Sequence, residues 1–411
     1  MRLFRIRILG PLLLTALAAL GGSATIDGQA RQAPRFEVDP FWPKPLPNHW
    51  ILGNVVGVDV DADDHVWIVH RPGTLERMET YAAQTPPWAD CCKAAPPVLE
   101  FDQAGNLLHA WGGPGDGYDW PVSMHGIAID PTGNVWIGGN GRAAAPAPGS
   151  APAPYSGPGG PPYNDTMLLQ FTQDGKFLKQ IGKAGQSQGS NDTANLKGPA
   201  KIWFDVPAAE MYVADGYGNS RVIVFDAKTG AYKRHWGAYG NRPDDVALGA
   251  YAPPGQPPAK QFRTPVHCAV VSVDKVVYVC DRVNDRIQMF RPDGTFLKEQ
   301  IFYPNTRGDG SVWDIAFSRD AAQTYMYVGD GSNHKIHVLD RATLQELTNF
   351  GDGGRQPGQF YAVHSIATDS KGNLYTTETY RGQRVQRFIY RGLAPVTKME
   401  QGVVWPTSRP Q

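Results

Sequence analysis

The chain has 411 residues and equal numbers of acidic and basic side chains, 39 of each. A net charge of zero gives no electrostatic basis for binding nucleic acid or an anionic membrane surface, so neither is expected as a partner. The length would allow two or three average domains, but 46 Gly and 35 Pro supply many turns, and the repeats described below favour a single closed unit.

The first segment, residues 1–30, has the features of a secretory signal peptide. It begins with the basic stretch M-R-L-F-R-I-R and continues with an apolar run that is too short for a membrane span. Small residues favour cleavage near residue 24 or residue 30. Because no later apolar stretch is long enough to cross a bilayer, we expect a protein without stable membrane insertion, located in the periplasm or outside the cell.

Residues 31–50 are treated as an N-terminal extension. Their segment F-E-V-D-P-F-W-P-K-P-L-P-N-H-W is too rich in proline for a central strand. The extension either packs across the fold or supplies an outer strand at its end, and the sequence leaves both placements open.

Residues 51–411 contain six copies of one repeat, and these copies define the fold class. Each copy has an inner strand that closes in Asp, a turn, a second strand with an aromatic residue near its start, and two further strands. The second strands are predicted to begin at Val66, Val135, Met211, Val277, Met326 and Leu374. The third strands are predicted over 97–101, 167–171, 221–225, 286–290, 335–339 and 384–389. We therefore predict an all-β fold, a six-bladed β-propeller.

Two blades carry long insertions between their second and third strands, at residues 72–96 and 142–164. The second insertion is rich in Ala, Pro and Gly, which is typical of an extended surface loop. It is also placed to act as a lid, because this connection emerges on the rim where the inner strand begins.

Four cysteines would be oxidisable in an extracytoplasmic compartment. Cys268 and Cys280 lie on the two arms of one predicted hairpin, and a shift of one residue in register decides whether they face each other. Cys91 and Cys92 are adjacent, and the sequence does not choose between a local bond, other partners and free thiols.

One position in the repeat carries histidine in alternate blades. Counting back eleven residues from the second-strand aromatic residue locates the first residue of the inner strand. This slot holds His125, His267 and His364 in the second, fourth and sixth blades, and Val56, Lys201 and Trp313 in the others. Any single histidine is readily explained as a structural side chain. Three at one height around a ring predict a zinc site with an open fourth position instead.

Three further polar residues follow second strands and therefore lie on the same rim as the histidines. They are Arg71, Tyr217 and Arg282. Taken singly, the arginines are also explained by ion pairs with a neighbouring acid at the end of a blade strand, such as Asp215, Asp281, Asp330 or Glu378. Tyr217 becomes a plausible base where a metal and a guanidinium group favour its phenolate.

With these motifs the chain resembles the peptidyl-α-hydroxyglycine α-amidating lyase family, a six-bladed propeller of NHL-type repeats. V-A-D-G-Y-G-N-S-R (213–221) is similar to the segment with the family's catalytic tyrosine, and V-C-D-R-V-N-D-R-I-Q (279–288) and W-I-V-H-R (67–71) are similar to its arginine segments. M-H-G-I-A-I-D, V-H-C-A-V-V and V-H-S-I-A coincide with its three zinc-histidine strands. The resemblance covers roughly residues 55–388.

The resemblance implies a role for each of these residues. His125, His267 and His364 would be zinc ligands, Tyr217 the base, and Arg71 and Arg282 the arginines that bind the substrate carboxylate. In the family a calcium ion is held by backbone oxygens at the positions of Val58 and Ile127 and by an aspartate after the third histidine. Ser365 stands in that place here, so the resemblance does not support Ca²⁺.

The implied function is a secreted, zinc-dependent lyase that acts on a small or peptide-derived substrate with a carboxylate. It would cleave the C–N bond of an N-acyl α-hydroxyglycine to an amide and glyoxylate, and we expect it to be a monomer. Alternatives are a ureidoglycolate-like substrate, a metal-dependent hydrolase or lactonase, and a propeller that only binds. A lactonase would require acidic and Asn metal ligands, which the three histidines disfavour.

Overall fold

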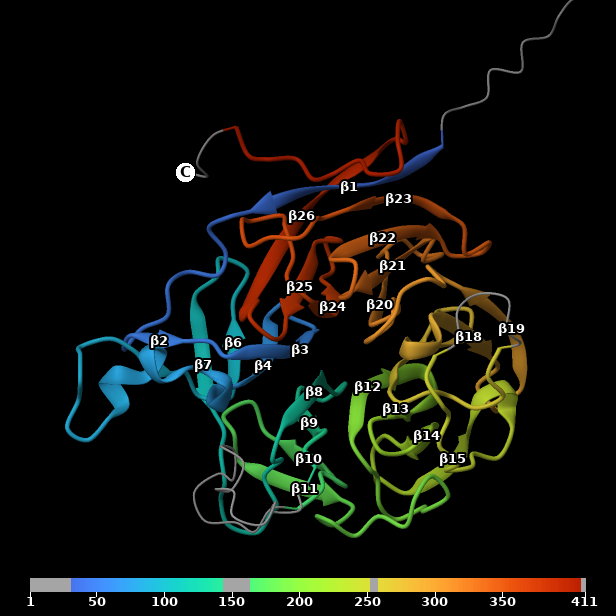
Figure 1. Ribbon diagram of the computed structural model, residues 1–411, viewed down its shortest axis with the longest axis horizontal. Helices are drawn as coiled ribbons and strands as arrows, with labels where there is room; N and C mark the ends of the chain where they lie inside the picture. The colour runs from blue at the N-terminus through green and yellow to red at the C-terminus, as the bar shows by residue number, and fades with distance from the viewer. Residues whose placement is uncertain (1–30, 143–162, 252–257, 408–411) are drawn as a thin grey trace, which may run out of the picture.

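In the computed structural model, six four-stranded antiparallel sheets are arranged as blades around a central channel (Figure 1). The structure describes residues 31–142, 163–251 and 258–407. It confirms the predicted all-β, six-bladed β-propeller. The predicted signal peptide (1–30) lies outside the described residues, as does nearly all of the predicted second insertion (142–164).

Five blades run from an inner to an outer strand in chain order. The first blade consists of β3 (Asn54–Val60), β4 (Val66–Arg71), β6 (Val98–Phe101) and β7 (Leu107–Trp111). The second consists of β8 (Met124–Ile129), β9 (Val135–Gly139), β10 (Leu168–Phe171) and β11 (Phe177–Ile181). The third consists of β12 (Pro199–Asp205), β13 (Glu210–Asp215), β14 (Arg221–Asp226) and β15 (Tyr232–Trp236). The fourth consists of β16 (Val266–Val271), β17 (Val277–Asp281), β18 (Arg286–Phe290) and β19 (Phe296–Ile301). The fifth consists of β20 (Asp314–Phe317), β21 (Tyr325–Asp330), β22 (Lys335–Asp340) and β23 (Glu346–Phe350).

The sixth blade closes the ring with a strand from the N-terminal extension. Its inner three strands are β24 (Val363–Thr368), β25 (Leu374–Glu378) and β26 (Arg384–Pro395), and its outer strand is β1 (Gln32–Asp39). β1 pairs antiparallel with β26, with Val38 opposite Phe388. Of the two placements left open for residues 31–50, the structure therefore shows the outer strand, which joins the two ends of the propeller.

The second-strand aromatic residues form the cores between neighbouring blades. Trp67, Trp136, Tyr212, Tyr278, Tyr327 and Tyr375 are all fully buried. Each ring packs on the facing sheet, and burial of a side chain of this size contributes a few kcal/mol (roughly 2–3). Because these cores lie between sheets, the channel itself is free to hold polar side chains from the inner strands.

The insertion at residues 72–96 is fully described. It contains the 3₁₀ turns η1 (Pro72–Thr74) and η2 (Arg77–Ala83) and the short strand β5 (Lys93–Ala94), which pairs parallel with β2 (Trp50–Ile51). In Figure 1 it extends outward from the first blade, away from the channel.

All four cysteines are paired. Cys268 and Cys280 face each other directly across β16 and β17 and form a disulfide with a Cα–Cα distance of 4.8 Å. The register is therefore the one that lets these two cysteines bond, which the sequence had left open. Cys91 and Cys92 are bonded to each other.

Among the helices within the described residues, none is long and apolar enough to cross a membrane.

Candidate metal centre

His125, His267 and His364 converge at one end of the channel. Each is the second residue of its inner strand, β8, β16 or β24, rather than the first as predicted. In all three strands the pairing register with the second strand shifts at the histidine. Such β-bulges insert an unpaired residue and redirect its side chain. The bulges therefore explain how residues at a strand end place their rings in the channel.

Backbone carbonyl groups of the alternate blades fix the orientation of these rings. Nδ1 of His125 lies 2.9 Å from the Ala200 carbonyl oxygen, and Nδ1 of His364 lies 2.7 Å from that of Val56. Nδ1 of His267 makes the same contact with the Trp313 carbonyl oxygen. A carbonyl oxygen accepts only, so each Nδ1 carries the proton and each Nε2 offers a lone pair. Val56 and Ala200 themselves lie at register shifts, which leaves their carbonyl groups available.

The three imidazoles fit a divalent metal. Their candidate ligand atoms all lie within 4.8 Å of one another, and their ring centroids are 4.7–5.0 Å apart. Burial lowers the pKa of all three well below the ordinary value for histidine, and the charge of Arg282 lowers it further. The rings are therefore neutral at pH 7, which is the form that binds a metal, and their Nδ1–H···O=C bonds are the support usual for metal-bound histidine.

Tyr217 lies against the open side of this cluster. Its hydroxyl oxygen is 2.9 Å from Nε2 of His125 and 3.1 Å from Nε2 of His267. The residue follows β13 at the rim, as its position after the second strand predicted. A group bound at the three Nε2 atoms would thus lie next to the phenolic oxygen.

Arg282 connects this tyrosine to the rim. Its Nη1 donates to the Tyr217 hydroxyl at 3.2 Å, its Nη2 donates to Asp309 at 3.3 Å, and its guanidinium carbon lies 4.4 Å from the centroid of the Trp313 ring. Its Nε is buried and has no hydrogen-bond partner among the described residues. A buried cation with an unused donor beside the histidines is suited to binding an anionic group.

Arg71 is held by hydrogen bonds to residues of the second blade. Its Nε donates to the backbone carbonyl of Met124 at 2.8 Å, and its Nη2 donates to the side-chain oxygen of Asn140 at 2.8 Å. Because Met124 immediately precedes His125, this contact ties the arginine to the strand that presents a histidine.

The acids at the ends of second strands pair with other cations. Asp215 binds Arg221, and Asp281 binds Arg286, at 2.8 and 2.6 Å. Glu378 binds Arg384 at 2.6 Å, and Asp330 contacts His337 at 3.3 Å. Residues of the third strands therefore take the four carboxylates considered as partners for Arg71 and Arg282. Arg282 instead forms an ion pair with Asp309.

The slot prediction fails in the third blade. Trp203 pairs with Tyr212, nine residues apart, whereas Ala128 pairs with Trp136, eight residues apart. The turn between β12 and β13, which includes η3 (Val206–Ala208), is thus one residue longer. Ala200 occupies the slot equivalent to the histidines, and Lys201, which the count assigned to it, lies one residue further along.

Lys201 nevertheless extends into the channel, where it acts as a fixed cation. Its Nζ donates to both carboxylate oxygens of Asp314, at 2.7 and 2.6 Å, and to the Ile366 carbonyl at 3.4 Å. Ile366 occupies the same strand position as Val58 and Ile127, whose backbone oxygens the resemblance associates with calcium. The residues present therefore do not fit Ca²⁺, because an ammonium group already occupies the channel and Ser365 donates to Asp314 as well.

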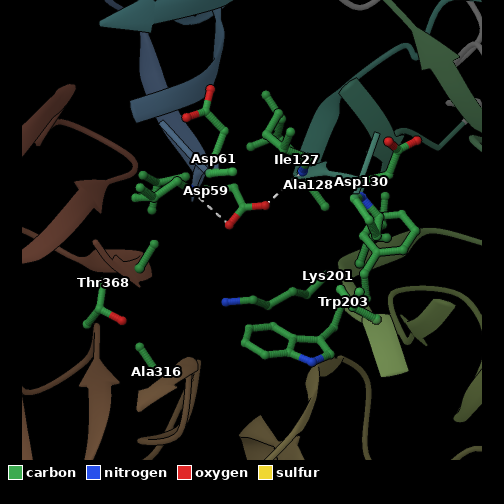
Figure 2. A pocket seen from close by; sticks show the side chains of 18 of the residues that line it. Asp59, Asp61, Ile127, Ala128, Asp130, Lys201, Trp203, Ala316 and Thr368 are labelled. Carbon is green, nitrogen blue, oxygen red and sulfur yellow. Dashed lines mark hydrogen bonds between the residues drawn. The ribbon is translucent and has the colours of Figure 1, made fainter. Parts of the chain in front are cut away.

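Beyond Lys201 the channel widens into a cavity of about 330 Å³, lined by residues that follow the histidine position along the inner strands. Figure 2 shows Asp59, Lys201 and Trp203 in its wall. Burial raises the pKa of Asp59 in its wall to about 6, although the Ile129 and Val60 backbone amides donate to this carboxylate. The Lys201–Asp314 pair lies between this cavity and the three histidines.

A second cavity, of about 490 Å³, opens beside Tyr217 on the histidine side. Arg142 and Lys197 line it together with Asp165, whose carboxylate accepts hydrogen bonds from three backbone amides. The cavity is large enough for a small substrate and carries two cationic side chains.

Two rim residues were missed from the sequence. Tyr380 lies five residues after Tyr375, the same offset that separates Tyr217 from Tyr212, so the repeat count could have found it. Its hydroxyl donates to Asp309 at 2.9 Å, and Asp309 binds Arg282. Asp309 itself lies in the long connection before β20, where no repeat position identifies it.

In sequence, the chain is similar to peptidyl-glycine α-amidating monooxygenases. No family model matches the chain. A stretch of 269 residues is 23% identical to the peptidyl-glycine α-amidating monooxygenase B of Xenopus laevis, over 62% of this chain and 25% of that protein. A stretch of 263 residues is 26% identical to the mouse peptidyl-glycine α-amidating monooxygenase, over 62% of this chain and 22% of that protein. The match thus spans about a quarter of the length of these relatives.

Among solved structures, a virginiamycin B lyase from Staphylococcus aureus is similar, with a TM-score of 0.46, 12% identity and coverage of 86% of this chain and 99% of that one. A protein of unknown function from Bacteroides thetaiotaomicron has a TM-score of 0.49 and 12% identity, with coverage of 88% and 77%. The sequence matches to the amidating monooxygenases confirm the resemblance that the motifs indicated, which is to the peptidyl-glycine α-amidating enzymes.

Proposed function

We propose that this protein is an extracytoplasmic, metal-dependent lyase of the amidating-lyase type. Its substrate would be an N-acyl α-hydroxyglycine or a similar small carbinolamide, cleaved at the C–N bond to an amide and glyoxylate. The observation that carries the proposal is the cluster of three buried imidazoles whose Nε2 atoms converge beside the Tyr217 hydroxyl group. The two disulfides support an oxidising compartment.

The histidines would hold zinc, which supplies a Lewis acid that lowers the pKa of a bound hydroxyl group. Tyr217 has its oxygen at the Nε2 atoms and is therefore placed to take the proton of the substrate α-hydroxyl group. Arg282 donates a hydrogen bond to the same oxygen, which holds it beside the histidines. The buried guanidinium group of Arg282, with its unused Nε donor, is placed to bind the substrate carboxylate.

The bond changes balance without a further reactant. Loss of the hydroxyl proton to Tyr217 lets the C–O electrons form the carbonyl group of glyoxylate, and the C–N bond breaks with its electron pair on nitrogen. The amide nitrogen then takes this proton from Tyr217, which returns the tyrosine to its starting form. Arg71 is committed to Met124 and Asn140, so we assign it a positioning role for the His125 strand.

Release of glyoxylate from an N-acyl α-hydroxyglycine tests this function. Zinc-loaded wild type should release glyoxylate, and Tyr217→Phe should be slower by about 10²–10⁴-fold, the usual effect of losing a general base. Tyr380→Phe is a matched control, because among the described residues this phenol at the same repeat position bonds to Asp309 and to none of the three histidines. Its rate of glyoxylate release should fall by less than about tenfold relative to wild type.

Two results would count against the proposal. Equal rates for wild type and Tyr217→Phe would remove the tyrosine from the mechanism. No glyoxylate from the zinc-loaded wild type would favour another substrate or a binding role.

A further inference from the structure

A second group of potential metal ligands lies on the first blade, far along its inner strand from the histidine triad. Asp61, His65 and Glu100 place one ligand atom each within 4.8 Å of the others. Nδ1 of His65 is 2.8 Å from one Glu100 oxygen, and Nδ1 of His109 contacts the other. The group offers two imidazoles and two carboxylates.

The second blade shows what this position looks like without such chemistry. Asp130 corresponds to Asp61, since each carboxylate accepts the indole N–H of the tryptophan six residues later at 2.9 Å. Both aspartates are labelled in Figure 2, and both carboxylates point away from the centre of the cavity. In the second blade the Gln170 amide donates to Asp130 at 2.8 Å, so that carboxylate is satisfied by neutral donors.

Three of the positions that differ between the two blades carry metal-binding side chains in the first blade. By strand pairing and turn position, Asn134, Gln170 and Lys179 of the second blade correspond to His65, Glu100 and His109 of the first. The first blade has histidines where the second has Asn134 and Lys179. It has a second carboxylate, that of Glu100, where the second blade has the Gln170 amide.

Burial makes this exchange costly unless a cation is present. Glu100 is only 2% exposed, and among the described residues its ion-pair partners are the two histidines, with no Lys or Arg. A carboxylate cannot donate to Asp61 as Gln170 does to Asp130, so the first blade has two neighbouring carboxylates whose charge a bound divalent metal would balance. The histidines are partly exposed, which leaves a path from solvent.

We propose that Asp61, His65, Glu100 and His109 form a second divalent-metal site, on the outer part of the first blade. Mixed imidazole and carboxylate ligands suit Zn²⁺ or Cu²⁺ rather than Ca²⁺ or Mg²⁺. The site is separate from the candidate lyase centre and does not depend on that assignment.

Zinc titration against a competing chromophoric chelator tests the site, with the second blade supplying the control residues. In full-length protein with His267→Ala, which removes a ligand of the triad, about one equivalent of zinc should still bind. Adding the exchanges His65→Asn, Glu100→Gln and His109→Lys to this protein should abolish binding of that one equivalent of zinc. Asp63→Asn, a charge change at an exposed position of the same turn, should leave it unchanged.

The proposal is overturned if the His267→Ala protein binds no zinc stoichiometrically, or if the triple exchange leaves the bound equivalent in place. Should His267→Ala fail to fold, the same exchange in the wild-type background should reduce the bound zinc by about one equivalent. An unchanged count there would also contradict the second site.

Discussion

Replacing Lys201 with methionine should destabilise the propeller strongly, because the exchange leaves Asp314 buried without its cation. Asp314 is 1% exposed, and both of its oxygens accept from the Lys201 ammonium group. Removing one partner of a buried pair typically costs about 3–5 kcal/mol. The backbone amides of Ile315 and Ile366 and the Ser365 hydroxyl still donate to Asp314, so we expect about 3 kcal/mol, at the lower end.

Equilibrium unfolding in urea measures this loss as a decrease in the unfolding free energy at an unchanged m-value. The double variant Lys201→Met/Asp314→Asn removes both charges and should be more stable than the single variant. Lys335→Met, which breaks a pair with the exposed Glu400, should cost less than about 1 kcal/mol. The reasoning would be refuted if Lys201→Met cost no more unfolding free energy than Lys335→Met. It would also be refuted if the double variant were no more stable than Lys201→Met. Calcium should leave the wild-type midpoint unchanged, because the ammonium group already occupies the channel.

Two further predictions concern the rim and the fifth blade. Arg282→Lys should lower kcat/KM for glyoxylate release by at least about tenfold, because lysine cannot both contact Tyr217 and stack on Trp313. An unchanged kcat/KM would show that the planar guanidinium group is not needed to bind the substrate. His337 lies between Asp330 and Glu346; burial alone would lower its pKa, but the two carboxylates raise it to about 9. Its charged form therefore stabilises the fold fully below the unfolded pKa of about 6.5, and this contribution is lost as pH rises through about 9. Relative to His337→Gln, wild type should lose on the order of 3 kcal/mol of unfolding free energy across that range, and parallel pH profiles would contradict the assignment.

Much of the fold could be predicted because the repeat is local. The period-two alternation and the aromatic residue of each second strand place β4, β9, β13, β17, β21 and β25 to within a residue or two. Closure by β1 could not be predicted, since pairing between residues 32–39 and the last blade depends on contacts more than 300 residues apart. The disulfide between Cys268 and Cys280 was left open for a similar reason, because register is a tertiary property.

The candidate site was predictable as far as the repeat count extends. Counting positions within the repeat brought together the three histidines, Tyr217 and Arg282. It was wrong at Lys201, because the turn between β12 and β13 is one residue longer than in the second blade. It could not show the carbonyl groups of Val56, Ala200 and Trp313, because backbone acceptors leave no signal in side-chain identity. The pairing of Lys201 with Asp314 joins the third and fifth blades, so it could not be predicted from the repeat either.

The most direct test of the metal centre is anomalous diffraction at the zinc edge from crystals of the zinc-loaded protein. The proposed function predicts a peak among the Nε2 atoms of His125, His267 and His364, beside the Tyr217 hydroxyl group, and loss of that peak in His267→Ala. A zinc-loaded crystal with no peak at the three histidines would contradict the metal-dependent lyase.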